Sequence, residues 1–135
     1  MMCIKKKLEE EYFLLNFDHT FLAASLQEEA LLFGVNCHAH LLQESVQKFQ
    51  SFKPDFTLQH PLHHLSGGEN AILAVIFYSA LALHKHKSLN FLLHNILESL
   101  SPANRTALKA VLAEYQQHNI SYNLLQNNIV VPISE

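Results

Sequence analysis

Little in this sequence marks a disordered, fibrous or disulfide-rich protein. Its 135 residues include three glycines, four prolines and two cysteines, and tryptophan is absent. Its nine lysines and arginines are outnumbered by twelve acidic residues, which excludes a broad basic face for a nucleic-acid backbone. Because 49% of the residues are hydrophobic and 16% are charged, the composition predicts one folded domain over residues 1–135.

Secretion and membrane-spanning patterns are also missing. Residues 1–7 lack the apolar core of a signal peptide, and Cys3 and Cys37 form no spaced pair. The longest apolar run, at 71–83, is shorter than the roughly 20 residues that cross a bilayer. We therefore expect a cytoplasmic protein that has no direct membrane insertion and is peripheral to the inner membrane only through a partner.

The first half of the chain predicts helices after a short strand. Lysines at 5–7 and glutamates at 9–11 indicate a water-facing leader. Ser25 and Glu28 have the spacing of a capping box, and Gly34 supplies a stop. The expected elements are a strand at 12–15, helices at 26–33 and 38–52, and a loop at 53–64.

Strands alternate with helices in the second half. Residues 70–85 are apolar on every side, which predicts a helix buried at the centre of the fold. The other expected elements are strands at 89–93, 122–125 and 129–131, and a helix that begins at Ser101 and Pro102. This order predicts an α/β fold, with a helical subdomain at about 21–65 and a partial parallel sheet at about 66–135.

A serine and two glycines precede the central helix. The backbone N–H groups of Ser66, Gly67 and Gly68 and the positive end of the helix dipole would form a site for a phosphate oxygen. The glycines would allow close approach, and Ser66 adds a hydroxyl. A plain Gly-Gly turn before a helix accounts for the same residues equally well.

The pentapeptide Leu65-Ser66-Gly67-Gly68-Glu69 resembles the signature motif of ATP-binding cassette (ABC) ATPases. A second matching segment follows at that family's spacing. When Ser101 is aligned with the aspartate after the family's hydrophobic strand, Ser99, Leu100 and Ser101 take the D-loop positions. His94 and Asn95 then take the two acidic Walker B positions, and Gln126 takes the position of the switch histidine.

Upstream, residues 16–34 are similar to the glutamine loop and first helix of energy-coupling-factor and cobalt-type transporter ATPases, with Leu15 at the glutamine position. The resemblance covers residues 12–131. It implies the core of a P-loop NTPase of the ABC type, truncated on its N-terminal side.

The departures from the family concern hydrolysis. No G-x-x-x-x-G-K-[ST] phosphate loop is present in the sequence. Hydrolysis of ATP also needs carboxylates that hold Mg²⁺ or orient water, and His94, Asn95 and Leu15 supply none. We therefore expect no catalytic residues, no Mg²⁺ bound by this chain alone, and ATP held mainly by a partner.

One role survives these losses. In the family, the signature motif of one subunit closes over ATP held by another subunit. The corresponding residues here, Ser66, Gly67, Gly68 and Glu69, could therefore contact a nucleotide that a partner binds, that is, in trans. The expected partner is a second copy, a Walker A-containing ATPase or a membrane permease. Two alternatives are an interaction module that uses no nucleotide and the C-terminal lobe of an SMC-type ATPase, which the short segment at 1–11 disfavours because such lobes follow a long coiled coil.

Ten histidines raise the question of a metal site. Imidazoles cluster at 38–40 and at 60–64, but neither cluster has a closed-site ligand spacing, so we expect no metal. Cys37 beside His38 likewise gives no evidence of a nucleophile, because such pairs meet through the fold.

The strands at 89–93 and 122–125 are apolar. Unless another chain or the N-terminal segment covers them, they would leave an unpaired edge or face. The sequence therefore predicts a homodimer or a heteromer.

Overall fold

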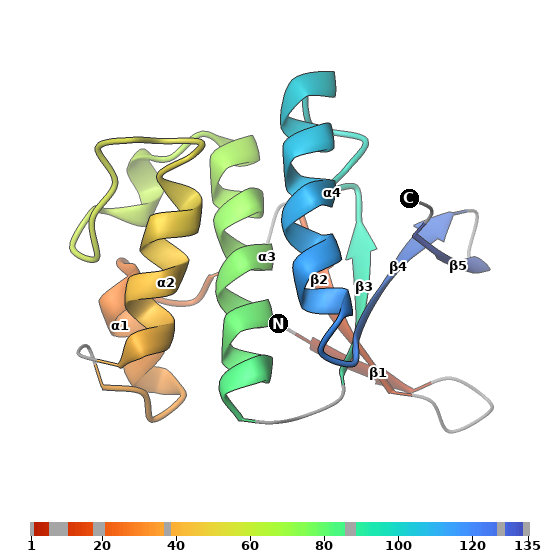
Figure 1. Cartoon of the computed structure of the whole chain (residues 1–135), viewed down its shortest axis with the longest axis horizontal. Coiled ribbons are helices and arrows are strands. Elements are labelled where there is room, and N and C mark those ends of the chain that lie inside the picture. The colour runs from red at the N-terminus through yellow and green to blue at the C-terminus, as the bar shows by residue number, and fades with distance from the viewer. Residues whose placement is uncertain are drawn as a thin grey trace.

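Five strands form one sheet in the part of the chain that the computed structural model describes, residues 2–5, 11–17, 21–36, 39–85, 89–126 and 129–133. Helices pack against this sheet and against each other (Figure 1). The elements are β1 (Met2–Lys5), β2 (Glu11–Asn16), α1 (Leu26–Leu32), α2 (His40–Phe49), the 3-10 turn η1 (Leu62–His64), α3 (Gly67–His84), β3 (Leu89–His94), α4 (Pro102–Gln116), β4 (Ile120–Gln126) and β5 (Ile129–Pro132). The fold is mixed α/β.

The sheet has the strand order β1-β2-β3-β4-β5. Its inner strands β2, β3 and β4 are parallel, and β1 and β5 pair antiparallel at the two edges. The chain moves across the sheet in one direction, from β2 through α3 to β3 and through α4 to β4. Because such crossovers are right-handed, both helices lie on the same face of the sheet (Figure 1).

Helix α3 lies at the centre of the molecule, as its sequence predicts. Residues 71–82 are all buried, since α3 packs between the sheet, α4 and α2. Leu15 and Leu93 pair across β2 and β3, and Phe91 stacks on Tyr122 of β4 with ring centroids 5.6 Å apart. These strand residues and α3 belong to one hydrophobic core.

The other face of the sheet, which we call the open face, carries alternate residues of the same strands. Asn16 of β2 is hydrogen-bonded to His94 of β3, and Ser121 of β4 donates to Asn90 of β3. Among the described helices, none packs on this face (Figure 1). Parallel strands are normally buried on both faces, and here polar side chains mixed with apolar ones such as Leu14 and Leu92 take the place of a second helical layer.

Helices α1 and α2 and the turn η1 lie between β2 and α3 in the sequence and pack beside α3 (Figure 1). The serine half of the predicted capping box of α1 is confirmed, because Ser25 Oγ accepts from Glu28 N at 3.2 Å. Gly34, with a φ of 74°, follows the end of the helix. Helix α2 is shorter than the predicted 38–52, since turns at 50–52 precede Pro54. The predicted loop at 53–64 contains η1.

The N-terminal segment contains a strand that the sequence did not predict. Met2–Lys5 forms β1 and pairs antiparallel with β2. Of the charged segment expected to face water, residues 6–10 lie outside the described ranges. In the sheet, β2 covers one edge of β3 and β5 covers the outer edge of β4, and neither apolar strand has an unpaired edge.

Candidate functional site

The residues singled out from the sequence gather at one edge of the sheet. The parallel strands β2, β3 and β4 end there, and α3 and α4 begin there because they run in the opposite direction (Figure 1). In open α/β sheets this carboxyl edge is the usual place for ligands. The start of α3, residues 66–69, therefore lies beside the ends of β2 and β3.

Ser66 and Glu69 form a reciprocal capping box at the start of α3. Ser66 Oγ accepts from Glu69 N at 3.1 Å, and Glu69 Oε1 accepts from Ser66 N at 2.9 Å. Neither bond uses the amides of Gly67 and Gly68, and the hydroxyl proton of Ser66 can still be donated. Ser66 and Gly67 are exposed. The start of α3 can thus offer two amides and a hydroxyl to an acceptor.

The carboxylate of Glu69 works against an incoming anion. It lies in the first turn of α3, where it already satisfies the positive end of the helix dipole. A phosphate that approached Gly67 would have to share that field with an existing negative charge. A phosphate at the start of α3 would therefore have to be held largely by groups outside this helix start.

Both glycines have close neighbours. A Cβ atom at Gly67 would lie 2.9 Å from Cζ of Phe17, and one at Gly68 would lie 3.4 Å from Cδ2 of Leu100. The absence of a side chain at Gly67 is therefore explained by the phenyl ring that follows β2. Gly67 therefore has a packing reason that is independent of any ligand, whereas the distance at Gly68 is an ordinary van der Waals contact.

The ends of β2 and β3 hold a polar pair on the open face. Asn16 Nδ2 and His94 Nδ1 are 3.3 Å apart. If the amide of Asn16 donates, this imidazole is neutral and carries its proton on Nε2. Leu15, in contrast, is fully buried in the core, so the side chain at the predicted glutamine-loop position does not reach the sheet edge. The sequence interpretation missed Asn16, since nothing local indicated its partner 78 residues away.

The turn from Asn95 to Ser101 carries the predicted D-loop positions. Asn95 is exposed and has a φ of 60°, a conformation that asparagine tolerates better than most residues. Ser99 is exposed, Leu100 is buried, and Ser101 caps α4 by accepting from Asn104 N at 3.2 Å. Through Leu100 this turn contacts the start of α3.

Gln126, at the predicted switch position, ends β4 at the same edge of the sheet. Its side chain lies outside the described part of the structure. Glu69 and Glu98 are the acidic residues of the described segments 66–69 and 95–101. Within the described ranges, no group of three His, Cys, Asp or Glu side chains is arranged to hold a metal ion.

The second histidine cluster lies just before α3. The rings of His63 and His64 have centroids 4.3 Å apart, and those of His60 and His64 are 6.3 Å apart. Cys37 and His38, the other sequence candidates, fall outside the described residues.

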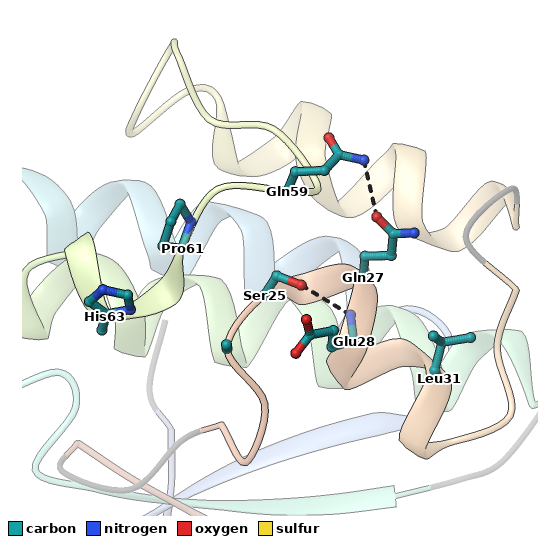
Figure 2. A pocket seen from close by; sticks show the side chains of 8 residues that line it. Ser25, Gln27, Glu28, Leu31, Gln59, Pro61 and His63 are labelled. Atoms are coloured by element: carbon teal, nitrogen blue, oxygen red, sulfur yellow. Dashed lines mark hydrogen bonds between the residues drawn. The ribbon is translucent and has the colours of Figure 1, made fainter.

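A separate hollow of about 460 Å³ lies between α1 and the segment that leads to η1 (Figure 2). Gln59 and Gln27 form a hydrogen bond of 3.1 Å at its rim, and Ser25 and Glu28 lie beside it (Figure 2). None of the predicted site residues lines it. The full lining is Ala24, Ser25, Gln27, Glu28, Leu31, Gln59, Pro61 and His63.

A buried carboxylate that the sequence did not indicate connects α1 to α3. Glu29 is fully buried; its Oε1 accepts from the amides of Leu22 and Ala23 at 2.9 and 2.8 Å, and its Oε2 accepts from the Tyr78 hydroxyl at 2.5 Å. Burial, and then the hydrogen bond to Glu29, raises the pKa of Tyr78 well above its ordinary range. This group is a structural link, since it lies away from the sheet edge.

No protein-family model, curated protein or solved structure matches this chain. In the described part of the chain, no helix combines the length and the hydrophobicity needed to cross a membrane. The structure thus defines a mixed α/β fold in which residues 66–69 lie at the carboxyl edge of the sheet, with Ser66 and Gly67 exposed.

Proposed function

We propose that this chain is a degenerate ABC-type subunit that does not hydrolyse ATP alone and that presents the start of α3 to nucleotide bound by a partner. The observation that carries the proposal is the exposed start of a long, buried helix, where Gly67, Gly68 and Ser66 retain donors outside the capping box. A helix start of this kind suits a phosphate oxygen.

The partner would supply the rest of the site. Because Glu69 opposes an anion at the start of α3, the phosphates must be held by a lysine-bearing loop on the other chain. That chain would be a Walker A-containing ATPase, alone or in an assembly with a permease, because a second copy of this chain would bring no phosphate loop. Purified protein alone is expected to bind and hydrolyse no ATP, and micromolar ATP binding in calorimetry would overturn the proposal.

A charge substitution at Ser66 tests the proposed contact without removing the cap. Asparagine and aspartate are equally good N-cap residues and nearly the same shape, so Ser66→Asn and Ser66→Asp should be equally stable. The carboxylate of Ser66→Asp would repel a phosphate, whereas the amide of Ser66→Asn would not. The pair therefore isolates electrostatics at this position.

The measurement is affinity capture of the full chain from its source cells, with and without a non-hydrolysable ATP analogue. The wild type and Ser66→Asn are expected to retain a phosphate-loop ATPase only when the analogue is present, and Ser66→Asp is expected to lose it. Equal nucleotide-dependent retention by all three proteins would contradict a contact between Ser66 and the nucleotide.

A second function has its own support. The capping box and the contact between Phe17 and Gly67 account for the motif by packing alone, which favours an interaction module that uses no nucleotide. In that case the same capture experiment would retain a partner equally with and without the analogue. A partner lost only in Ser66→Asp would exclude this alternative.

A further inference from the structure

Arg105 holds the turn that precedes α4. Its Nε donates to the carbonyl of Leu97 at 2.9 Å, and its Nη2 donates to the carbonyl of Leu100 at 3.2 Å. The guanidinium is always charged and planar, so these are charge-assisted bonds with a fixed angle between them. One side chain thus fixes two carbonyls of the turn at 95–101.

The turn held in this way contacts the start of α3. The side chain of Leu100 is 5% exposed, and its Cδ2 lies 3.4 Å from the position of a Cβ atom at Gly68. On the other side, the ring of Phe17 packs against Gly67. Phe17 is itself tied to the end of β3, because its amide donates to the carbonyl of His94 at 3.1 Å.

The start of α3 therefore lies between two side chains that both depend on the end of β3. Glu98 and Ser99, at the tip of the turn, are exposed. Ser66 and Gly67, at the start of α3, are exposed as well. The contacts of Arg105 and Leu100 thus connect two exposed segments, 66–67 and 98–99.

We propose that Arg105 is a positioning residue that couples the turn at 95–101 to the start of α3. The inference rests on these contacts and holds whether or not the chain contacts a nucleotide. Loss of the guanidinium should loosen the turn, release Leu100 and allow the first turn of α3 to open. The rest of α3 should stay closed, because it is buried along its length.

Amide hydrogen exchange measured by NMR on the full chain tests the coupling. The amide of Asn70 donates to the carbonyl of Ser66 at 2.9 Å, so its exchange reports opening of the first turn. In Arg105→Gln, exchange at Asn70 should rise by about fivefold or more, while exchange at Val75 and Ile76 stays unchanged. Lys109→Gln, which removes the same charge one turn further along α4, should leave Asn70 as in the wild type.

Two further variants separate positioning from charge and from general stability. Arg105→Lys keeps the charge but cannot reach both carbonyls, so exchange at Asn70 should lie between that of the wild type and that of Arg105→Gln. If Arg105→Gln does not fold, Arg105→Lys takes its place in the comparison with the wild type. In a Leu100→Val background, Arg105→Gln should add less exchange than in the wild type, because the effect passes through Leu100. Unchanged exchange at Asn70, or equal acceleration along all of α3, would overturn the proposal.

Discussion

At the residue scale, the glycine pair at the start of α3 shows how one motif can have two physical causes. The sequence suggested that Gly67 and Gly68 admit an anion. The structure places the Phe17 ring against Gly67 and the less crowded Leu100 against Gly68. The two glycines therefore differ in how strictly packing requires them.

Alanine substitutions should separate the two positions. Alanine is favoured over glycine within helices by about 1 kcal/mol, so Gly68→Ala should stabilise the protein by a few tenths to 1 kcal/mol. In Gly67→Ala the clash with Phe17 should cancel this gain or produce a net loss of about 1 kcal/mol. Urea unfolding measures the stability change of both variants. The control is Gly67→Ala in a Phe17→Ala background, where the new methyl group no longer clashes with a ring. Equal effects at the two positions would contradict the packing explanation.

Three tyrosines make stability sensitive to alkaline pH. Burial raises the pKa values of Tyr78, Tyr115 and Tyr122 above their ordinary value. Below about pH 10 these phenols are neutral in both the folded and unfolded states, so their contribution is fully present. Above that pH the unfolded chain loses protons that the folded protein keeps, and stability should fall by up to about 1.4 kcal/mol per pH unit for each tyrosine.

Urea titrations from neutral to alkaline pH check this expectation. Tyr122 also shares a hydrogen bond of 2.6 Å with Ser79, so Tyr122→Phe should be less stable at neutral pH. Its alkaline slope should nevertheless be shallower by about a third, since one of the three tyrosines no longer titrates. A slope unchanged by this substitution would argue against burial as the cause.

At the scale of elements, local patterns predicted most boundaries. The capping residues Ser25 and Ser101 and the apolar run of α3 were sufficient to place three helices. β1 was missed because its evidence is backbone pairing with β2, which leaves no local pattern. The contacts of Asn16 with His94 and of Glu29 with Tyr78 join residues far apart in sequence, so only the fold could reveal them.

The docking of α1 depends on Glu29. Glu29→Ala would leave two part-buried amides and the buried Tyr78 hydroxyl without their acceptor, which should cost about 3 kcal/mol or more. Glu29→Gln keeps one carbonyl oxygen for the amides and should cost less than half as much. Chemical denaturation compares the pair; equal losses would mean that the volume of the side chain, not its acceptors, holds α1.

At the scale of the whole molecule, the sheet has one helical layer. The open face carries Leu14, Leu125 and Val130 among polar residues, and described helices cover only the opposite face. Alternation of polar and apolar side chains explains how such a sheet can meet water on one side. Because no described helix covers this face of the inner strands, a second molecule could cover it.

Self-association or partner association through this face is the expected outcome. Light scattering of the purified protein should give a dimer or a larger assembly. Leu125→Asp, which places a charge on the open face, should shift the assembly toward monomer, whereas Thr106→Asp on the exposed side of α4 should not. A well-folded wild-type monomer at high concentration would contradict the expectation.

Direct pairing of β3 with β4 also limits how a strand from another chain could join the sheet. Residues 89–93 bond to 120–124 in parallel register, and β2 occupies the other side of β3. Fragment complementation, in which a separate peptide inserts a strand into the middle of the sheet, would have to break this ladder. Among the described strands, β1 and β5 each have one unpaired side, so a strand from another chain can extend this sheet without that disruption at either of these two antiparallel edges.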